Sequence, residues 1–390
     1  MMNMQKNACV IDAYSHGSYH EVINQGYLMM ISELYEHVTY IADKSSCQNL
    51  KLLMEASDFD YSNVSICEKK ISKPKLKWAG LNYLLWLIKV SLLNYIYYIR
   101  SPKNTDVFYN NNLFFAIGLI RFFSFFNKNK VFDMCHNEME LINPSKRNTR
   151  VMKILGIYFD FVFKKSVLSP KMKFLLLSPQ MADYFKTFIR RENYDRIDWI
   201  DHCYVRPKNE IICQKEKIPF SGVKIGIPGA VTEDRGLPQL RNVLAQLNNE
   251  KVKIFAISYI KGDVESRFLE YVNKSSTLLP FDEYNGYVQQ MDALMLLYDR
   301  ESYKLTASGA VLEAIWNLKP IFAIKNAYFE YLFNKFGNIG ELFDDVENLS
   351  NYLNNLNDAF FARYRDSLVR ARESLLPSGV KTQLHKAICS

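Results

Sequence analysis

The chain has 390 residues, which is more than one ordinary hydrophobic core accommodates and enough for two domains. Hydrophobic residues make up 48% of the sequence, so a large core can form and intrinsic disorder is excluded. The formal net charge of +8 favours anionic ligands or an anionic membrane surface. It lacks the dense basic stripe of a dedicated nucleic-acid-binding protein, so no nucleic-acid partner is expected.

Short apolar runs alternate with longer helical patterns in the first half of the chain. Strands are predicted at 8–13, 38–43, 106–110, 130–136 and 173–178. Helices are predicted at 20–36, 78–99, 112–126, around 148–166 and around 179–190. This alternation predicts a parallel sheet with helices on both of its faces. The apolar run at the start of the chain is only as long as a strand, so no signal peptide is expected.

The segment 205–222 contains two prolines, many charges and little periodicity, and we interpret it as a linker. The alternation then begins again. Strands are predicted at 223–229, 252–258, 276–281, 293–299 and 320–324, and helices at 237–247, 283–291, 308–318, 348–356 and 358–376. We therefore expect two doubly wound α/β domains, 1–204 and 223–375, with a tail, 376–390, that packs back on the first domain.

The helix predicted at 308–318 begins with Ser308 and Gly309, just after the predicted strand 293–299. In open α/β sheets, ligands bind at the carboxyl edge of the strands. Free amides and the positive end of a helix dipole can bind a phosphate or diphosphate there. Glu313 lies one turn further on and can accept hydrogen bonds from sugar hydroxyls, so together these residues describe a nucleotide site. The alternative is an ordinary serine-capped helix whose glutamate complements the dipole.

The segment Leu312-Glu313-Ala314 and the following "NLKPIFA" resemble the carboxyl-terminal signature of retaining GT-B glycosyltransferases, especially family 4. The resemblance implies a GT-B fold, in which two Rossmann-like doubly wound domains face a central cleft. It also implies that Glu313 binds the ribose of the nucleotide. The first glutamate of the signature falls on Leu305, which puts a carboxylate contact with the donor sugar in doubt. The adjacent Lys304 could reach a phosphate instead.

Three further positions follow from this resemblance. The stretch "IGIPGAVTEDRGLPQL" is similar to the first strand and loop of the family's nucleotide domain, with Gly229 at the first glycine and Arg235 at the basic position. The family's usual arginine after that glycine is Ala230 here. Arg235 can still bind a diphosphate through two hydrogen bonds, and its alternative role is a surface charge.

In the first domain, "DAYSHG" is similar to the family's glycine-bearing first loop, which places Gly17 near the donor phosphates and the acceptor. His136 follows a predicted strand, where the family often has a histidine beside the reacting sugar. The alternative for His136 is a structural histidine. The resemblance thus gives His136, Arg235 and Lys304 as catalytic residues.

The reaction implied is sugar transfer from a nucleoside-diphosphate sugar to a glycan or lipid-linked acceptor in surface polysaccharide or glycoconjugate synthesis. It is expected to retain anomeric configuration and to need no metal and no cofactor beyond the donor. The alternative is a non-catalytic sugar-nucleotide-binding or scaffold protein on a decayed GT-B fold, which Leu305 and Ala230 favour. The motif Asp58-Phe59-Asp60, typical of metal-using GT-A transferases, lies in a polar loop and is read as a chance match.

Other classes of protein lack their motifs here. No GxGxxG follows a predicted strand, and there is no GxxxxGK[ST] or GxSxG. The seven cysteines are scattered and never spaced CxxC, which indicates reduced thiols in a cytoplasmic protein without a zinc site.

The apolar segment 78–99 has two interpretations. Lys89, Asn82 and Asn94 interrupt it, which disfavours a membrane-spanning helix. It is either a mostly buried helix or a helix that lies in the membrane interface, and the lysines of "KKISKPKLKW" before it suit the second interpretation. A lipid-linked acceptor would place the protein peripherally on the inner face of the cytoplasmic membrane.

Overall fold

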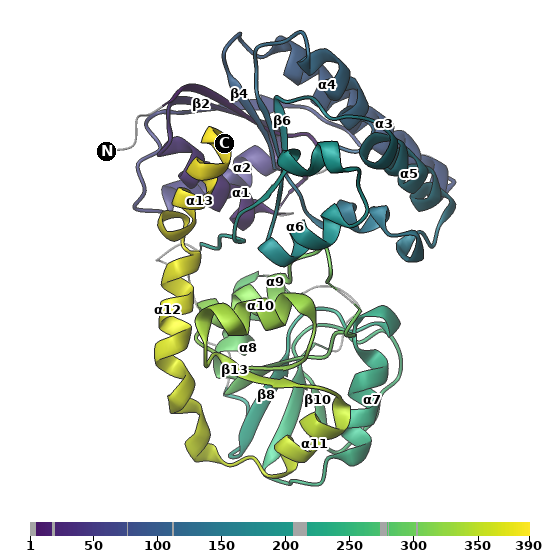
Figure 1. The fold of residues 1–390 in the computed structure, drawn as a ribbon. Helices are drawn as coiled ribbons and strands as arrows, with labels where there is room; N and C mark the ends of the chain where they lie inside the picture. Colours follow the sequence, from purple (N-terminus) through teal and green to yellow (C-terminus); the bar gives the residue numbers. More distant parts are fainter. Residues whose placement is uncertain are drawn as a thin grey trace. The chain divides into compact units, whose positions relative to one another are not determined.

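A computed structural model describes residues 5–17, 20–75, 77–110, 113–205, 217–273, 279, 281–301 and 303–390. The chain divides into two compact units (Figure 1). The first contains residues Met1–Lys208, Leu305–Ala307 and Leu375–Ser390, and the second contains Asn209–Lys304 and Ser308–Ser374. Each unit is built on its own parallel β-sheet.

The first unit has a seven-stranded sheet in the order β3-β2-β1-β4-β5-β6-β7, in which every pair is parallel. Its strands are β1 (Gln5–Asp12), β2 (Tyr35–Asp43), β3 (Val64–Lys69), β4 (Asp106–Tyr109), β5 (Val131–Met134), β6 (Met172–Leu176) and β7 (Ile197–Trp199). Every residue of β5 and β6 is buried. Continuous burial is typical of a parallel sheet whose two faces are both covered by helices. Each of these strands nevertheless carries one buried ionisable residue, Asp133 in β5 and Lys173 in β6.

The helices of the first unit gather on different sides of this sheet (Figure 1). They are α1 (Glu21–Ser32), α2 (Lys44–Glu55), α3 (Ala79–Arg100), α4 (Ala116–Ser124), α5 (Arg150–Phe159) and α6 (Pro179–Lys186). A π-helical segment, Asp160–Lys165, continues α5, and a 3-10 helix, η1 (Asn137–Ile142), follows β5. Helix α3 contacts both α4 and α5, whereas α1 contacts α2 and the C-terminal helix α13 (Pro377–Cys389).

The second unit has a six-stranded parallel sheet in the order β10-β9-β8-β11-β12-β13. Its strands are β8 (Val223–Ile227), β9 (Val252–Ala256), β10 (Leu269–Tyr271), β11 (Ala293–Leu296), β12 (Ile321–Ile324) and β13 (Gly340–Phe343). Its helices are α7 (Leu237–Gln246), α8 (Phe281–Gln290), α9 (Gly309–Trp316), α10 (Ala327–Phe336), α11 (Val346–Asn354) and α12 (Arg365–Leu375). The core packs α7 and α11 against the sheet through aliphatic side chains such as Leu240, Val243 and Leu349.

Helix α13 packs on the first unit, to which its residues belong. The backbone N–H of Asp201 donates to Gln383 Oε1 over 2.7 Å, and Lys173 Nζ donates to the carbonyl of Ala387 over 2.9 Å. Lys381 and Glu33 form an ion pair between α13 and the end of α1. The last helix of the chain thus completes the domain in which the chain began.

The predicted strand 276–281 is wrong at Leu279 and Phe281, the two of its residues that the structure describes. Phe281 begins α8, and the third strand of this half of the sheet is β10, which ends at Tyr271. Its apolar residues suggest a strand, but the rest of that prediction, 276–278 and 280, lies outside the described residues. Most of the predicted linker, 206–216, also lies outside them, and the division of the chain after Lys208 falls within it.

Candidate functional site

The second sheet reverses its winding between β8 and β11, which are adjacent in the sheet but not consecutive in the chain. Just after β8, Gly229 adopts a left-handed backbone with φ of 75°. Among the described residues, no atom lies within 4 Å of the position that a Cβ would take at Gly229. The turn therefore needs glycine for its backbone, and the space beside it is open. Doubly wound sheets bind ligands outside the carboxyl ends of the strands at such a switch point.

Arg235 lies at the same edge of the sheet. It ends a 3-10 turn, Glu233–Arg235, and its exposed side chain borders a crevice with Pro228 and Tyr298. The next residue, Gly236, has φ of 86°, and a Cβ there would lie 2.5 Å from the carbonyl oxygen of Leu297. This close approach fixes the backbone that carries Arg235. An exposed guanidinium at the strand ends can bind a diphosphate through two parallel hydrogen bonds.

Helix α9 begins at the same edge, after the loop that leaves β11. Ser308 occupies its N-cap position, but its Oγ is buried and makes no hydrogen bond within the described part of the chain. The N-caps of the neighbouring helices are satisfied, because Asn326 accepts from the N–H of Phe329 and Asp345 from that of Asn348. Gly309 is exposed, with open space where a Cβ would stand. The start of α9 therefore combines an uncapped turn with room for a ligand.

Glu313 lies one turn into α9, between buried neighbours, and is itself half-buried. Its Oε2 accepts a hydrogen bond from the hydroxyl of Tyr284 in α8 over 2.6 Å. The bond holds the carboxylate in place at the sheet edge. A positioned carboxylate of this kind can accept hydrogen bonds from vicinal hydroxyls, and Tyr284 is a site residue that the sequence had not suggested.

Lys304 stands before α9 in the loop after β11. Its Nζ pairs with Glu301 Oε2 at 2.5 Å, and the glutamate side chain is 74% exposed. An ion pair at the surface is worth about 1 kcal/mol or less, so a diphosphate can compete with Glu301 for the lysine. Leu305, where the family's signature has its first glutamate, is buried and offers no carboxylate.

The first sheet has its own switch point, between β1 and β4. Asp12 ends β1 and Asn110 follows β4, and both are buried. Asn24 of α1 connects them: its Nδ2 donates to Asp12 Oδ2 over 2.7 Å, and its Oδ1 accepts from Asn110 Nδ2 over 3.3 Å. Gly17 lies in the loop after β1 with φ of 60°, and its N–H donates to Ser45 Oγ. A buried polar network thus lines this sheet edge.

His136 follows β5 and is buried beside this network. Its Nε2 lies 3.0 Å from the carbonyl oxygen of Asn110, which can only accept, so Nε2 carries the proton and Nδ1 is the acceptor. The rings of His20 and His202 lie 5.0 Å and 6.0 Å away. Burial, and then the two neighbouring histidines, hold the pKa of His136 well below its ordinary value. The imidazole is therefore neutral near pH 7.

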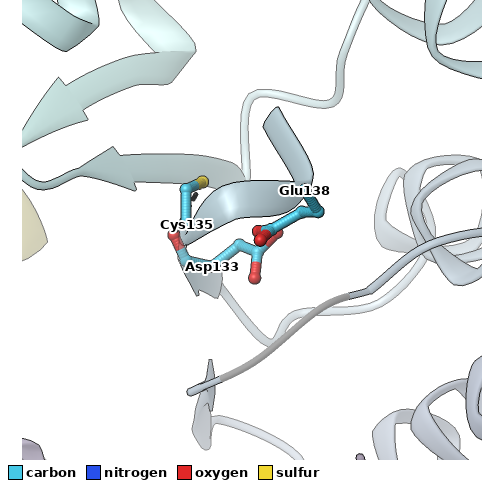
Figure 2. A group of neighbouring side chains, drawn as sticks. All are labelled: Asp133, Cys135 and Glu138. Carbon is cyan, nitrogen blue, oxygen red and sulfur yellow. Dashed lines mark hydrogen bonds between the residues drawn. The ribbon is translucent and has the colours of Figure 1, made fainter. Parts of the chain in front are cut away.

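Three side chains at the end of β5 could offer ligand atoms to a metal ion: Asp133, Cys135 and Glu138 (Figure 2). Their ligand atoms lie within 4.8 Å of one another, and all three residues are buried. Burial raises the pKa of Asp133 and Cys135 well above their ordinary values and that of Glu138 to about 7. A metal would need all three deprotonated, whereas burial favours the protonated forms. Protonated side chains fit these surroundings better than a cation.

A cavity of about 250 Å³ lies next to this cluster in the first unit. Tyr14, Phe114 and Tyr83 contribute aromatic surface to it, while Glu138 and Lys146 contribute polar groups. Another cavity, of about 280 Å³, lies around Ala8 and Thr105, toward the amino ends of β1 and β4. The first of these cavities is the candidate ligand site of this unit, because ligands of α/β sheets bind at the carboxyl ends of the strands.

The structure divides the site residues predicted from sequence between the two units. Gly229, Arg235, Lys304, Ser308, Gly309 and Glu313 belong to the second unit, and Gly17 and His136 belong to the first. The residues that sequence reasoning missed are Asp12, Asn110, Asp133, Glu138 and Tyr284. Asp12, Asn110 and Glu138 end or follow strands that the apolar pattern had predicted, so a polar residue at a strand end was an available signal, whereas Asp133 lies inside β5. Tyr284 gave no such signal, because it lies within a helix.

No protein-family model matches the chain, and no curated protein matches its sequence. Solved structures do resemble it. Anabaena Alr3699/HepE in complex with UDP-glucose aligns over 99% of this chain and 100% of its own, with a TM-score of 0.60 and 12% identity. Sucrose-phosphate synthase from Thermosynechococcus elongatus covers 98% of each chain, with a TM-score of 0.60 and 12% identity.

A third neighbour is WaaG, a glycosyltransferase involved in lipopolysaccharide biosynthesis. It aligns over 96% of this chain and 98% of its own, with a TM-score of 0.53 and 13% identity. These neighbours are GT-B glycosyltransferases. Together with the two parallel α/β sheets they show that the chain has the two-domain, Rossmann-like GT-B fold.

The raised pKa of Glu138 predicts a pH-dependent stability. In the folded chain the carboxyl stays protonated up to a pH of about 7, against an ordinary value of 4.5. The contribution of the protonated carboxyl to the free energy of unfolding is therefore complete below pH 4.5 and is lost as the pH rises through 7. The free energy of unfolding falls by about 3 kcal/mol at most. Glu138→Gln, which mimics the protonated form, should unfold in urea with a smaller decrease in stability between pH 5 and 7.5 than the wild type.

Metal addition separates the two interpretations of this cluster. If Asp133, Cys135 and Glu138 held a divalent cation, Zn²⁺ or Mn²⁺ would raise the melting temperature of the wild type and not that of Glu138→Gln. That result, or equal pH dependence in both proteins, would contradict a protonated Glu138.

Proposed function

We propose that the protein is a glycosyltransferase that moves a sugar from a nucleoside-diphosphate sugar to a glycan or lipid-linked acceptor. The observation that carries this proposal is the arrangement at the switch point of the second sheet. There an open glycine turn, an exposed arginine and the uncapped start of α9 share one edge with the carboxylate of Glu313. The complex of the neighbouring HepE with UDP-glucose supports a nucleotide sugar as donor.

The hard step of such a transfer is stabilising the leaving diphosphate while the anomeric carbon gains positive charge. The amides at the start of α9, Arg235 and Lys304 present positive charge and hydrogen-bond donors on one sheet edge. Such fixed donors stabilise developing charge without reorganising. We propose on this basis a metal-independent reaction of the retaining, family 4 type, in which the donor is the only small molecule needed. The hydroxyls of the ribose would bind Glu313.

On the acceptor side we propose a contact with His136. Its imidazole is neutral, and its Nε2–H is held by the carbonyl of Asn110, which leaves Nδ1 as an acceptor. A hydroxyl of the bound sugar or of the acceptor can donate to such an atom. Gly17, in the loop after β1, lies in the same unit with open space beside it and would allow phosphate or sugar to approach the backbone.

We also propose the cellular setting. The protein would act in the cytoplasm, at the inner face of the cytoplasmic membrane, in the synthesis of a surface polysaccharide or glycoconjugate. The amphipathic cavity beside Tyr83 and Lys146 suits an acceptor with both an apolar part and an anionic part, as a lipid-linked glycan has.

A panel of nucleoside-diphosphate sugars tests the proposal directly. A true donor should raise the melting temperature, and in the presence of lipid-linked oligosaccharide it should release the nucleoside diphosphate as sugar is transferred. The competing function is a non-catalytic sugar-nucleotide-binding protein, favoured by Leu305 and Ala230. It would show the thermal shift without transfer for any acceptor. A panel without any thermal shift would contradict both.

Glu313→Gln should weaken nucleotide binding and leave the fold intact. Glutamine keeps an oxygen that can accept from Tyr284, but it loses the charge that strengthens hydrogen bonds from ribose. Such a bond is worth about 1.5–3 kcal/mol, so the dissociation constant measured by calorimetry should rise roughly 10- to 100-fold. Tyr284→Phe is the control: it keeps the carboxylate and should weaken binding less. Unchanged affinity in Glu313→Gln would leave Glu313 as a helix-dipole partner only.

Arg235→Ala and Lys304→Ala should lower turnover more than they lower affinity for the nucleoside. Both residues are assigned to the diphosphate, whose charge grows in the transition state, so their contribution grows with it. Steady-state kinetics should therefore show a lower kcat with a smaller change in KM. Glu301→Ala, which removes the ion-pair partner of Lys304, is the matched control and should retain turnover. If both lysine and arginine variants kept wild-type kcat, the diphosphate assignment would be wrong.

His136→Ala should lower the rate of transfer while donor binding persists, because donor and histidine are assigned to different units. The neutral imidazole also makes this role insensitive to pH between 6 and 8. Calorimetry with the donor and a transfer assay measure the two effects, and circular dichroism checks the fold. Unfolding of this variant, with full activity of His136→Gln, would mean that the histidine serves only packing.

A further inference from the structure

The exposed apolar surface of this protein is concentrated in one place. Among the residues that the structure describes, every exposed large hydrophobic side chain except Leu52 lies on α3, α4 or the α5 segment, or directly beside them. The second unit contributes none within its described part. A monomeric protein normally scatters such residues singly, and a contiguous concentration indicates a binding surface.

Helix α3 has two apolar faces. On one face Leu81, Leu85, Ile88 and Leu92 follow helical spacing, and each is 38–48% exposed. The other face is buried, and the carbonyl of Asn94 accepts from the hydroxyl of Tyr109 over 2.9 Å. In the described chain α3 alone is long and apolar enough to cross a membrane, by length and composition. Because α3 is hydrogen-bonded to β4 on its inner side, it lies along the surface of the domain. Its outer face could therefore contact a membrane only with the helix axis parallel to the membrane plane.

The other two helices extend this face. Phe122 and Phe126 are 55% and 77% exposed at α4, and Ile157 and Phe161 are 67% and 56% exposed on the α5 segment. We call these outward residues of α3, α4 and the α5 segment the apolar face. Figure 1 shows the three helices together on one side of the first unit.

Hydrogen bonds hold the three helices in a fixed arrangement. Tyr158 of α5 donates to the carbonyl of Phe115 over 2.8 Å and accepts from the N–H of Gly118 over 2.7 Å. Ser91 of α3 accepts from the N–H of Phe115 over 3.1 Å. A Cβ at Gly118 would lie 2.3 Å from the Tyr158 hydroxyl, so glycine permits this close packing. The apolar face is therefore preformed.

The charges around the apolar face have one sign. The sequence contains no acidic residue between Glu68 and Asp106, nor between Asp106 and Asp133. On α5, Asp160 is neutralised by Arg147 and Lys164. The exposed basic residues on or beside the three helices are Lys73, Lys75, Lys77, Arg100, Lys128, Lys130, Arg150, Lys153 and Lys165. A basic rim around aromatic and aliphatic side chains complements anionic headgroups above an acyl layer.

We propose that the apolar face docks the first unit on an anionic lipid bilayer, with α3, α4 and the α5 segment lying in the interface. The basic rim is what favours a bilayer over a second copy of this chain, since two such rims would repel each other. The cavity assigned to the acceptor borders the same helices through Tyr83 and Met152. The route that docking would give a lipid-linked acceptor to this cavity rests on the proposed function. The docking itself does not rest on it.

Vesicle sedimentation without donor or acceptor tests the docking separately from the reaction. Full-length protein should sediment with phosphatidylglycerol-containing vesicles at low salt, less at high salt, and weakly with pure phosphatidylcholine. Phe122→Ser/Phe126→Ser/Ile157→Ser should weaken vesicle binding at least about tenfold, because three exposed side chains lose their burial in the interface. These side chains are exposed in the folded chain, so the variant should keep its melting temperature.

Leu52→Ser is the matched control, since Leu52 is 65% exposed on α2, away from the apolar face, and it should bind vesicles as the wild type does. Lys73→Gln/Lys75→Gln/Lys77→Gln should lose the preference for anionic lipid. Absence of vesicle binding at low salt, or full binding by the triple serine variant, would overturn the proposal. So would a wild type that sediments as a dimer without lipid and a serine variant that sediments as a monomer, because the face would then bind a second copy. None of these results would change the transfer assay with a soluble acceptor.

Discussion

Parallel strands deliver their carboxyl ends to a single edge of a sheet, and both units of this protein depend on that constraint. Strands β5 and β6 are buried along their whole length, and apart from Asp133 and Lys173 their residues are apolar. The polar groups of the candidate site therefore lie mainly where strands end. In the second unit that edge carries Gly229, Arg235 and the start of α9, and in the first it carries Asp12, Asn110 and His136. Sheet topology, more than any sequence motif, determines where the candidate site lies.

The polar groups at the two sheet edges differ in exposure and charge. In the second unit the groups are exposed donors and cations, which suit an anion that arrives from water and brings its own charge. In the first unit the groups are buried, and burial has pushed them toward neutrality: His136 loses its proton while Asp133 keeps its own. A neutral, hydrogen-bonding edge fits sugar hydroxyls better than phosphates. This contrast supports the assignment of the donor nucleotide to the second unit and of hydroxyl groups to the first.

The sequence predicted most of the fold because apolar runs and helical periodicity survive in buried parallel strands. It failed where those signals are weak. Strand β3 is only half-buried and β7 has three residues, so neither showed a clear run, and neither was predicted. The run at 276–281 looked like a strand although Phe281 begins α8. Helix α2 was also missed; its mean composition is polar, and Asp43 caps it through the N–H of Ser45.

The sequence could predict those residues of the candidate site that lie close together along the chain. Ser308, Gly309 and Glu313 could be read from one segment, because a helix start after a strand is a local pattern. The hydrogen bond from Tyr284 to Glu313 joins residues far apart in sequence and depends on how α8 packs beside α9. Likewise the trio of His20, His136 and His202 arises only when segments that follow different strands meet. Partners of that kind leave no trace in spacing or composition.

The apolar face is another feature that the sequence alone could not predict in full. Sequence alone left 78–99 open between a buried helix and an interfacial one, and the structure shows that one side of α3 is buried while the other exposes an apolar stripe. Its inner residues pack on the sheet, while its outer stripe continues across α4 and α5, where no single segment is long enough to suggest a membrane. Tyr158 and Gly118 determine that continuity by locking α5 against α4. A surface assembled from three helices is a property of their packing, and so its function can be argued only once that packing is known.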